Sequence, residues 1–540
     1  MRIGAAIMVF GMALSVHLNG QLTGDRPIKC GWGAHPELLQ ARIAAVQERP
    51  DRQVMYISAS GEFAVHYDIT AAGPNGMNHS PDLTDSDVNG TPDWVESVAA
   101  ALDSARNLLL ALGFDPAPAD DDSVYDVYLQ EYNGDTYGEI FYPDGYDKNG
   151  RIISYLCMDN NFSEDENYYT HGIDAARITV AHEYFHAVQL GYGIRLEDAY
   201  FFEISSTWFE EVAFPDVNDW IYWYDDFGDN PTRAFNALSY VSPSGKYGYA
   251  IAAFGHYLTD RYGVGVMPQI WGKMRTVDAE GNPAGVNAIA ATMESIATYR
   301  GSLTSAWTDF VARLFFSGVD TTHYFHPDQD WLTPPDAGVP QLLIGTQSQV
   351  FEDLKPGAVG IQALNLAGPT NLCLQIEVSP LEYAARLVLN LDRLSLDSLT
   401  REPWYVADLT SLSRPILVVG GESGNVEIMA TAIDTLVPLD YALDFIAPNP
   451  VYPHGRLAHT SLTLGYRIAE ALPQSDHRIV IYNILGQELY RQQITRSVGE
   501  GSHKLHMSTQ PFITWPSGVY ILSLTVDQRH TFSRTFTLLR

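Results

Sequence analysis

His182, Glu183 and His186 form the pattern H-E-x-x-H. The residues around them predict a helix that begins near Asp174 and ends near Gly191. Histidines four positions apart lie on one face of a helix, so both imidazoles can bind one metal ion with Glu183 at its open side. The pattern predicts hydrolysis by zinc, which lowers the pKa of a water toward about 7 while Glu183 accepts the proton as general base. Two ordinarily hydrogen-bonded histidines inside a buried helix are the alternative.

A catalytic zinc needs a third protein ligand, and a carboxylate commonly completes a pair of imidazoles. The segment from Phe201 to Glu211 is predicted to be the next helix. We expect Glu203 to be the third ligand, because a turn at Gly191-Tyr192-Gly193 leaves room for an antiparallel return of the chain. Glu210 lies two turns further along nearly the same face, and it is the alternative ligand or a supporting residue.

A hydrogen-bond donor and a strand that binds the substrate are the remaining parts of the expected site. Tyr249 or His256, in a helix predicted from about Tyr247 to Tyr262, would stabilise the oxyanion. Ile152 to Met158 is expected to be an edge strand to which an extended peptide adds through main-chain hydrogen bonds. A proline at Ser154 should then weaken peptide binding.

These residues resemble a known family. The sequence His182-Glu183-Tyr184-Phe185-His186, followed by a helix of the form E-x-x-x-x-W-x-E, is similar to the gluzincin metallopeptidases, in particular secreted bacterial members with an H-E-[FY]-F-H helix. The resemblance covers roughly residues 60 to 320. It implies zinc binding by His182, His186 and Glu203, with Glu183 as the general base. The chain departs from the family at Ser205-Ser206, where many members have Gly or Ala.

A second metal pattern, D-x-[DN]-x-[DN]-G-x5-E, spans residues 85 to 96. Oxygens at alternate positions converge on Ca²⁺, Gly90 permits the sharp turn, and a helix is predicted from Trp94 to Leu112. The segment resembles the EF-hand-like calcium loops of extracellular proteins, although it has Pro92 at a usually apolar position and no helix before it. A turn that caps the helix is the alternative. The expected calcium ligands are Asp85, Asp87, Asn89, Thr91, Asp93 and Glu96.

Composition restricts the class of protein. The chain has 540 residues, of which 46% are hydrophobic, so it can form several cores. Acidic residues outnumber basic ones 65 to 32, and the net charge of −33 argues against a nucleic-acid partner. The cysteines Cys30, Cys157 and Cys373 do not predict a disulfide scaffold. The segment from Pro27 to Gly31 resembles the cysteine switch that keeps some zinc peptidases latent, and an incidental cysteine is the alternative.

The N-terminus predicts export. An apolar run from Ile3 to Val16 followed by polar residues is typical of a signal peptide, here residues 1–20 with a cut near Gly20. The mature protein is expected to be secreted or held at the outer-membrane cell surface, without a transmembrane segment. Residues 21–60 are interpreted as an irregular lead-in or short pro-segment, and residues 61–330 as the zinc domain.

Two β modules are expected behind the zinc domain. A linker at Thr333 to Pro340 precedes residues with period-two alternation, which predict a β-sandwich-like module over 340–437. A second module over 441–540 resembles the C-terminal sorting domain of type IX secretion. The resemblance rests on Pro448-Asn449-Pro450, Ile481-Tyr482-Asn483-Ile484-Leu485-Gly486-Gln487-Glu488 and Ser517-Gly518-Val519-Tyr520. It implies that the type IX secretion machinery is a partner; an ordinary carbohydrate-binding or fibronectin-like module is the alternative.

Taken together, these patterns predict a multidomain protein with an α+β zincin-like metallopeptidase domain and two β-sandwich-like modules. The expected activity is that of a secreted, calcium-stabilised zinc metalloendopeptidase that cleaves protein or peptide substrates. A cell-surface adhesin with a non-catalytic histidine helix is the rival from another class. A third possibility keeps the zinc but hydrolyses a bond other than a peptide bond.

Overall fold

A computed structural model describes most of the chain. The predicted signal peptide, residues 1–20, lies outside the described residues. No helix within the described ranges is long and apolar enough to cross a membrane. The ranges are 27–30, 49–70, 78–118, 123–142, 145–147, 149–237, 247–276, 284–343, 346–352, 354–366, 371–378, 383–388, 396–399, 404–406, 415–422, 424–433, 441–453, 459–468, 472–498 and 501–540.

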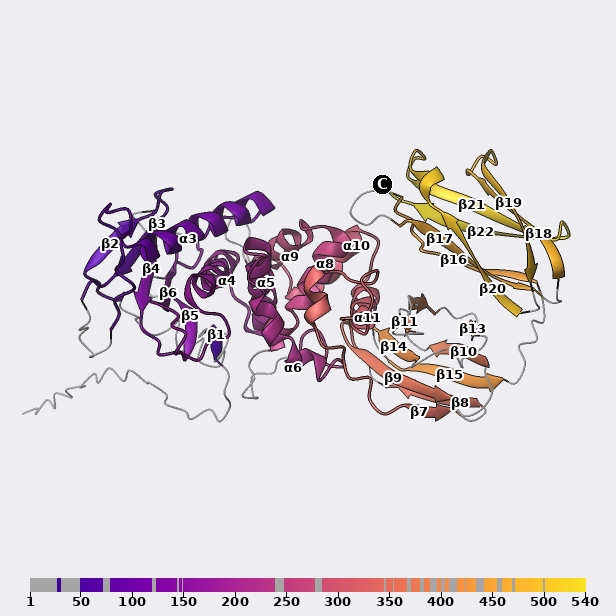
Figure 1. Cartoon of the computed structure of the whole chain (residues 1–540), viewed down its shortest axis with the longest axis horizontal. Coiled ribbons are helices and arrows are strands. Elements are labelled where there is room, and N and C mark those ends of the chain that lie inside the picture. The colour runs from indigo at the N-terminus through magenta and orange to yellow at the C-terminus, as the bar shows by residue number, and fades with distance from the viewer. Residues whose placement is uncertain are drawn as a thin grey trace, which may run out of the picture.

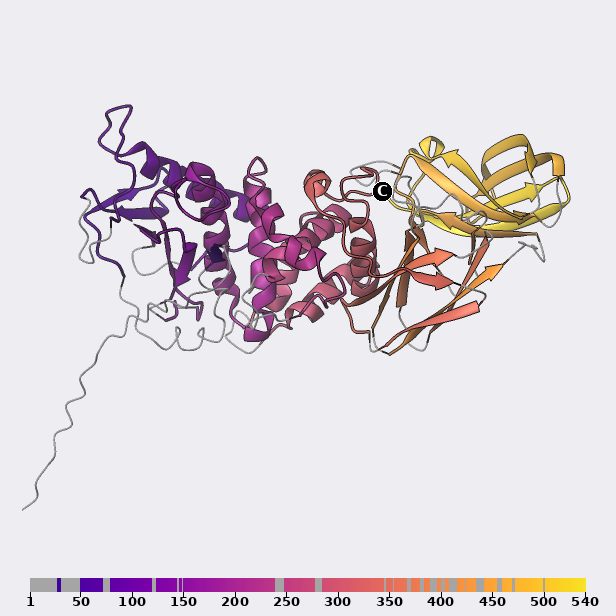
Figure 2. The ribbon, with the colours of Figure 1, turned by 60° about the horizontal axis from the view of Figure 1, so that its bottom comes forward.

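The molecule has an α/β part followed by several small antiparallel β-sheets (Figure 1). The sheet of the α/β part lies at one end of the elongated molecule, and the two β modules lie side by side at the other end (Figures 1 and 2). A layer of helices fills the space between them. The predicted metal-site helices therefore stand between a sheet on one side and further helices on the other.

The first sheet has six strands in the order β1-β5-β6-β4-β3-β2. Strand β5 runs antiparallel to β6, while β1 pairs with β5 in parallel. The lead-in was expected to be irregular, yet its described residues supply both edge strands, β1 and β2, by pairing with distant parts of the chain. The strands are β1 (Ile28–Cys30), β2 (Val54–Ile57), β3 (Phe63–Tyr67), β4 (Tyr125–Gln130), β5 (Thr136–Phe141) and β6 (Tyr155–Asp159).

The expectation of an edge strand at Ile152 to Met158 is wrong. The strand there, β6, begins at Tyr155 and has β5 on one side and β4 on the other. All five residues of β6 are buried, as in an interior strand that is covered on both faces. On the side away from β6, strand β5 pairs with β1, which is a terminal strand of the sheet.

The helices mostly follow the predicted apolar patterns. Helix α4 is buried over almost its whole length because it packs against the sheet, α3, α5 and α9. The helix predicted from Tyr247 to Tyr262 is divided at Ile251, whose backbone is not helical. The described α-helices are α3 (Asp93–Leu112), α4 (Gly172–Tyr192), α5 (Ala199–Ala213), α6 (Asp225–Gly228), α7 (Tyr247–Ala250), α8 (Ala252–Tyr262), α9 (Val266–Met274), α10 (Ala288–Thr298) and α11 (Leu303–Leu314).

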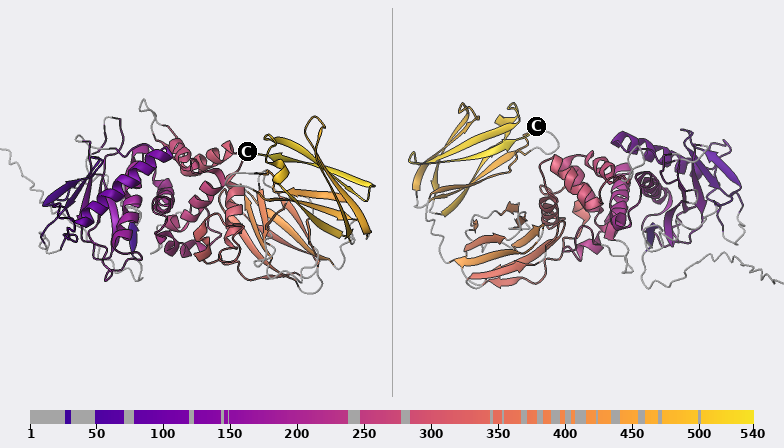
Figure 3. Two further views of the ribbon diagram at one scale, coloured as in Figure 1. Left: turned by 45° about the horizontal axis from the view of Figure 1, so that its top comes forward. Right: turned by 180° about the vertical axis from the view of Figure 1, so that it is seen from behind.

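The middle module consists of two sheets, ordered β13-β10-β15-β8 and β12-β11-β14-β9-β7. Helix α11 packs on β11 and β14, and Asp309 of α11 forms an ion pair of 3.0 Å with Arg386 of β11. The middle module and the helical layer therefore share a packed boundary (Figure 3). The strands are β7 (Gln341–Leu343), β8 (Thr346–Phe351), β9 (Val359–Leu366), β10 (Asn371–Val378), β11 (Tyr383–Val388), β12 (Leu396–Ser398), β13 (Trp404–Val406), β14 (Ile416–Gly421) and β15 (Val426–Ile433).

The last module has a hydrophobic core of its own between two sheets, β16-β17-β20 and β19-β18-β21-β22. Apart from the parallel pair β7 and β9, the described strand pairs of both modules are antiparallel, which is consistent with β-sandwich modules. The strands of the last module are β16 (Ala442–Ala447), β17 (Ser461–Ile468), β18 (Leu472–Tyr482), β19 (Glu488–Val498), β20 (Gly501–Ser508), β21 (Gly518–Val526) and β22 (His530–Leu538).

Candidate metal centre

Helices α4 and α5 bring three of the predicted ligands together. The Nε2 atoms of His182 and His186 face each other at 3.1 Å. The Oε2 atom of Glu203 lies 3.1 Å from Nε2 of His182 and 3.4 Å from Nε2 of His186. Cys30 of β1 adds a fourth donor, and one ligand atom from each of the four residues lies within 4.8 Å of the others. All four residues are buried, so these donors converge inside the protein.

The other ring nitrogen of each histidine contacts an oxygen acceptor. Nδ1 of His182 lies 2.6 Å from Oε1 of Glu210, and Nδ1 of His186 lies 2.7 Å from Oε1 of Gln189. A carboxylate accepts the Nδ1 proton, so this contact leaves Nε2 available as the metal-binding nitrogen of His182. Glu203 therefore lies with the two Nε2 atoms, where a ligand would be, and Glu210 lies behind His182.

Gln189 extends this support to helix α5. Its Nε2 atom donates to the main-chain oxygen of Phe202 at 3.2 Å and to the hydroxyl oxygens of Ser205 and Ser206 at 3.1 and 3.0 Å. These contacts fix the amide so that its oxygen faces His186. Ser205 and Ser206 thus hold the residue that orients a histidine.

Two glycines allow the close packing of the centre. A Cβ on Gly248 of α7 would lie 2.5 Å from Cβ of Glu203, so α7 approaches α5 more closely than any larger residue permits. A Cβ on Gly138 of β5 would lie 3.1 Å from Cγ of Glu183 and 2.9 Å from a methyl group of Thr179. Strand β5 therefore runs directly beside the expected general base.

The electrostatics of the centre favour positive charge. Burial alone would lower the pKa of His182, but hydrogen bonds to Glu203 and Glu210 raise it to about 9. Burial would raise the pKa of Glu203, but the charges of His186 and His182 and the hydrogen bonds to them lower it to about 2. The two carboxylates thus stabilise a cation between the helices. A divalent metal ion at this position would be stabilised in the same way.

Glu183 is placed as an acid–base group. Its side chain is fully buried, and burial raises the pKa of Glu183 to about 7, against the opposing charges of the two histidines. Oε2 accepts a hydrogen bond of 3.5 Å from Sγ of Cys30, while Oε1 has no hydrogen-bond partner among the described residues. A carboxyl group with a pKa near neutrality can both accept and donate a proton.

The structure separates the two candidates for the oxyanion donor. The ring of Tyr249 lies 5.8 Å from the ring of His182, and its buried hydroxyl has no hydrogen-bond partner in the described part of the chain. His256 instead packs against Trp220 at 4.9 Å and His326 at 4.5 Å. Tyr249 is therefore the candidate at the centre, and His256 belongs to a neighbouring aromatic cluster.

Sequence reasoning missed a charge network next to the centre. The ammonium group of Lys29 is buried, contacts Asp219 and lies 2.8 Å from Oε2 of Glu210. The ammonium also lies over the rings of Trp223 at 5.2 Å and Tyr137 at 5.7 Å. No local pattern marks Asp219, and the only hint for Lys29 was its place beside Cys30.

The two imidazoles and the carboxylate form a donor set that suits Zn²⁺, and a thiolate is a further ligand that zinc accepts. The geometric observation behind this fit is that the donor atoms converge from two buried helices while their rear atoms are held by Glu210 and Gln189. The residues could therefore hold a metal ion, and the choice of zinc belongs to the proposal below.

The Asp85 loop forms a second group of acidic side chains. Carboxylate oxygens of Asp85, Asp87 and Asp93 lie within 4.8 Å of one another. Gly90 has a φ of 95°, in the left-handed region that the pattern requires, and its N–H donates to Asp85 at 2.9 Å. Helix α3 begins at Asp93, directly behind the loop.

The remaining predicted calcium ligands take part in the same loop. Asn89 donates its amide to Asp87 at 3.0 Å and to Oε1 of Glu96 at 2.8 Å. Thr91 donates its N–H to the side-chain oxygen of Asn89 at 2.9 Å. The hydrogen bond from Thr91 to Asn89 is that of an Asx turn, which forms without an ion. The loop is thus compatible both with a cation site and with the alternative of a capped turn.

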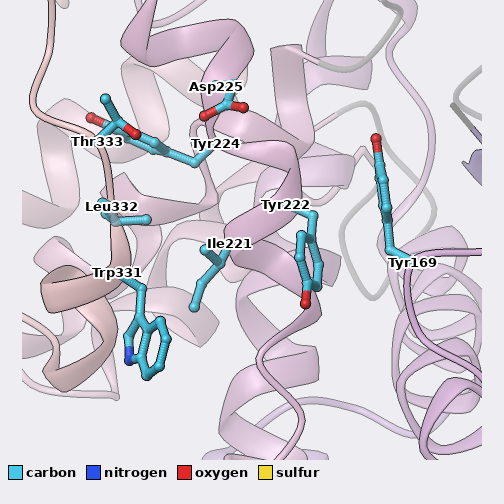
Figure 4. A pocket seen from close by; sticks show the side chains of 8 residues that line it. All are labelled: Tyr169, Ile221, Tyr222, Tyr224, Asp225, Trp331, Leu332 and Thr333. Atoms are coloured by element: carbon cyan, nitrogen blue, oxygen red, sulfur yellow. The ribbon is translucent and has the colours of Figure 1, made fainter. Parts of the chain in front are cut away.

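The structure also has a pocket of about 250 Å³, and Figure 4 shows the side chains that line it. Tyr169 in its wall stacks on Tyr222 at 5.2 Å and meets Trp223 edge-on at 5.3 Å. Trp223 in turn packs on Tyr249 at 5.2 Å. Aromatic rings therefore separate the pocket from the histidine pair. The pocket is lined by Tyr169, Ile221, Tyr222, Tyr224, Asp225, Trp331, Leu332 and Thr333.

Comparison with known proteins assigns no family. No family model and no curated protein matches the chain. Solved structures with partial similarity include a beta-glucuronidase from glycoside hydrolase family 2 (11% identity, 36% of this chain and 24% of that chain, TM-score 0.13). A Parabacteroides merdae beta-glucuronidase gives 11% identity over 38% of this chain and 29% of that chain, with a TM-score of 0.15.

A CARDB domain from Pyrococcus furiosus in complex with di-metal ions gives 12% identity over 20% of this chain and 100% of that chain, with a TM-score of 0.13. The chain spans about a quarter of the length of the first beta-glucuronidase. TM-scores this low support no inference about fold or activity.

Proposed function

We propose that the protein is a zinc-dependent metallopeptidase with a zincin-like catalytic domain. The observation that carries this proposal is the convergence of His182, His186 and Glu203 on one point, with Glu210 behind the first histidine. Three protein ligands with a water or substrate in the fourth position are typical of catalytic zinc. His182, His186 and Glu203 would be these three ligands, and the sulfur of Cys30 lies close enough to be a fourth donor.

Zinc bound at this point would polarise the substrate carbonyl and acidify the attacking water. Glu183 would accept the proton of that water on a carboxylate oxygen and return it to the leaving amine. Tyr249 would donate its hydroxyl hydrogen to the oxyanion of the tetrahedral intermediate. Glu210 and Gln189 would keep the imidazoles in the required orientation.

The position of strand β5 supports the proposal that the substrate is an extended polypeptide. A Cβ on Gly138 of β5 would lie 3.1 Å from Cγ of Glu183, so a peptide paired with the outer edge of β5 would run past the proposed general base. Main-chain hydrogen bonds from a strand edge align a peptide without regard to its side chains. This arrangement favours a polypeptide substrate over a small molecule, and a proline at Gly138 should damage peptide binding more than one at Ser154.

Metal content is the first test of the proposed function. Purified wild-type protein should contain one zinc ion per chain by elemental analysis, and the double variant H182A/E203A should contain none. The variant C157S is a matched control, because Cys157 packs with Tyr128 and Tyr155 in a separate cluster. Wild-type protein that binds no zinc would contradict the proposal.

Activity is the second test. Glu183→Gln keeps the shape of the side chain but removes proton transfer, so casein cleavage should fall by about 10²- to 10⁴-fold while zinc content stays the same. Glu197→Gln, an exposed change on the segment before α5, serves as the control. Measurable wild-type cleavage that Glu183→Gln leaves unchanged would exclude Glu183 as the base.

We also propose that the Asp85 loop binds Ca²⁺ and that the last module directs export. The loop offers three clustered carboxylates close to the start of α3. The last module has its own core, so it can serve as a unit recognised by a secretion system. Removal of residues 441–540 should leave the protein inside the cell envelope, and cell fractionation measures this. Unchanged export would contradict the sorting role.

A further inference from the structure

Strand β1 occupies the edge of β5 along which the proposed substrate would lie. Its register pairs Ile28 with Thr136 and Cys30 with Gly138, and the N–H of Ile28 donates to the main-chain oxygen of Asp135 at 3.0 Å. Figure 1 shows β1 beside β5 and next to the helices of the centre. A peptide cannot pair with this edge while β1 is there.

Cys30 extends from β1 into the metal centre. The residue is 0% exposed, and its Sγ atom lies within 4.8 Å of ligand atoms of His182, His186 and Glu203. Sγ also donates to Oε2 of Glu183 at 3.5 Å. The sulfur therefore lies on the side of the ligand set where the attacking water and Glu183 would have to meet.

Lys29 anchors the strand beside the centre. Its ammonium group pairs with Asp219 and Glu210 and is 2% exposed. Asp219 also accepts hydrogen bonds from Thr170 at 2.6 Å and from the indole of Trp223 at 2.8 Å. Because these donors orient Asp219 without Lys29, the cation enters an acceptor pocket that the rest of the protein builds.

We propose that residues 27–30 are a built-in inhibitor that keeps the protein latent, with Cys30 as the fourth metal ligand and Lys29 as the anchor. This inference rests on the proposed metal centre. On binding, the Sγ–H bond breaks, its proton passes through Glu183 to solvent, and sulfur takes the metal position that water would occupy. The protein then lacks both the attacking water and the free β5 edge.

Release requires a cut in the chain between Cys30 and β2. Strand β2 pairs with β3 at the opposite edge of the sheet, so a cut there separates β1 from the domain without removing β2. Hydrolysis of one peptide bond by a second protease supplies this cut. The fragment with Lys29 and Cys30 can then dissociate, and water can reach the metal.

The anchor also predicts a class of substrate. Once Lys29 leaves, the buried carboxylates of Asp219 and Glu210 remain side by side under the faces of Trp223 and Tyr137. Two buried carboxylates without a cation are unfavourable, so the pocket should accept a lysine or arginine side chain of a bound polypeptide. The released enzyme should therefore prefer peptides with a basic residue near the cleaved bond.

Latency is tested with Cys30→Ser in the full chain. This variant should cleave casein at least about 10-fold faster than wild type, because serine is a poor zinc ligand in comparison with a thiolate. Cys157→Ser should cleave at the wild-type rate. The double variant Cys30→Ser/Glu183→Gln should not show this increase in the rate of casein cleavage. Equal rates for Cys30→Ser and wild type would overturn the inference.

A spectroscopic measurement tests the ligand without reference to activity. Cobalt(II)-substituted wild-type protein should show a near-ultraviolet thiolate-to-cobalt charge-transfer band, and cobalt-substituted Cys30→Ser should lack it. Cobalt binding without this band in wild type would overturn the role of Cys30 but leave the metal centre intact. Absence of cobalt binding in both proteins would contradict the proposed function itself, and with it the inference.

A full chain with a site-specific protease sequence inserted between Gly33 and Ala34 gives a second test that keeps Cys30. Cutting should abolish the cobalt–thiolate band and raise casein cleavage, with mock-treated protein as the control. The cut protein should then cleave a peptide library about 10-fold faster at lysine- or arginine-containing peptides, and Asp219→Asn should reduce this preference. A cut that leaves both band and rate unchanged would overturn the inference.

Discussion

The buried candidate metal centre and the exposed Asp85 loop both present candidate ligand side chains at motif spacing, but they hold these side chains by different means. In the centre, the ligands come from α4, α5 and β1, and their orientation depends on Glu210, Gln189 and packing between elements. In the loop, Asp85 and Asp87 accept hydrogen bonds from the N–H of Asn89, only a few residues away.

Because one region is buried and the other exposed, we expect the loss of a ligand side chain to have different consequences in each. The centre combines buried carboxylates and histidines, and removing one partner leaves another buried polar group without compensation. The loop is exposed, so water can replace a lost ligand at little energetic cost. We therefore expect changes in the centre to act on metal affinity and activity, and changes in the loop to act on local stability.

Among changes in the two regions, Glu203→Ala should have the largest effect on metal binding. It removes a ligand and leaves the two imidazoles without their shared carboxylate, so zinc affinity should fall by more than roughly 100-fold, beyond the loss expected for a supporting residue. Competition with a fluorescent chelator measures the affinity. Asp87→Ala in the exposed loop is the matched control and should leave zinc affinity unchanged. A comparable loss in both variants would mean that the two regions do not bind metal independently.

Glu210→Gln should have the next largest effect. The amide can no longer act as a charged acceptor for the Nδ1 proton of His182, and changes of such supporting partners typically lower metal affinity by about 10- to 100-fold. The same titration provides the measurement. If Glu210→Gln lost as much affinity as Glu203→Ala, the assignment of ligand and supporting residue would need to be reversed.

The sequence predicted the parts of the centre that lie close together in the chain. The H-E-x-x-H spacing on one helix places His182, Glu183 and His186, because helical periodicity alone determines which side chains share a face. The position of Glu203 could also be inferred, since a short turn connects two antiparallel helices. The predicted edge strand was wrong because sheet order depends on pairing between distant segments, which the order of segments along the chain does not encode.

The parts that were missed have no local pattern. Cys30 contacts Glu183 across 153 positions of sequence, and Lys29 contacts Asp219 across 190. The cysteine could be noted as resembling a switch segment, but only the pairing of β1 with β5 places its sulfur among the histidines. The supporting role of Gln189 likewise depends on the packing of α4 against α5.

Calcium removal should lower thermal stability moderately, and this effect should depend on the Asp85 loop alone. If Ca²⁺ binds there, a free concentration about 30-fold above Kd stabilises the fold by about 2 kcal/mol, and a chelator selective for calcium should lower Tm by several degrees. Asp85→Ala should abolish the difference between calcium and chelator, whereas Asp165→Asn, an exposed change outside the loop, should preserve it. A wild-type Tm that does not respond to calcium would favour the capped-turn interpretation.

Glu211 provides a buried carboxylate that differs from those of the centre. It is 4% exposed, and burial, together with the negative charges of Asp328, Glu210 and Asp216, raises the pKa of Glu211 to about 9 from 4.5. Between these values the folded protein retains a proton that the unfolded chain releases. The stabilisation that protonated Glu211 provides is complete below about pH 4.5 and is lost as the pH rises through about 9. Over this range the free energy of unfolding falls by at most about 1.4 kcal/mol per pH unit.

Glu211→Gln should therefore remove part of the pH dependence of folding. The amide keeps the shape of a protonated carboxyl group, so the variant and wild type should unfold at the same temperature near pH 4.5, and the variant should be the more stable at pH 7 to 8. Thermal unfolding followed by circular dichroism over this range measures the difference, with Glu197→Gln as the exposed control. If the plots of Tm against pH for Glu211→Gln and wild type were parallel, Glu211 would ionise in the folded protein as it does in water. Burial of Glu211 would then have no more effect on its pKa than the exposed position of the Asp85 loop has on the carboxylates there.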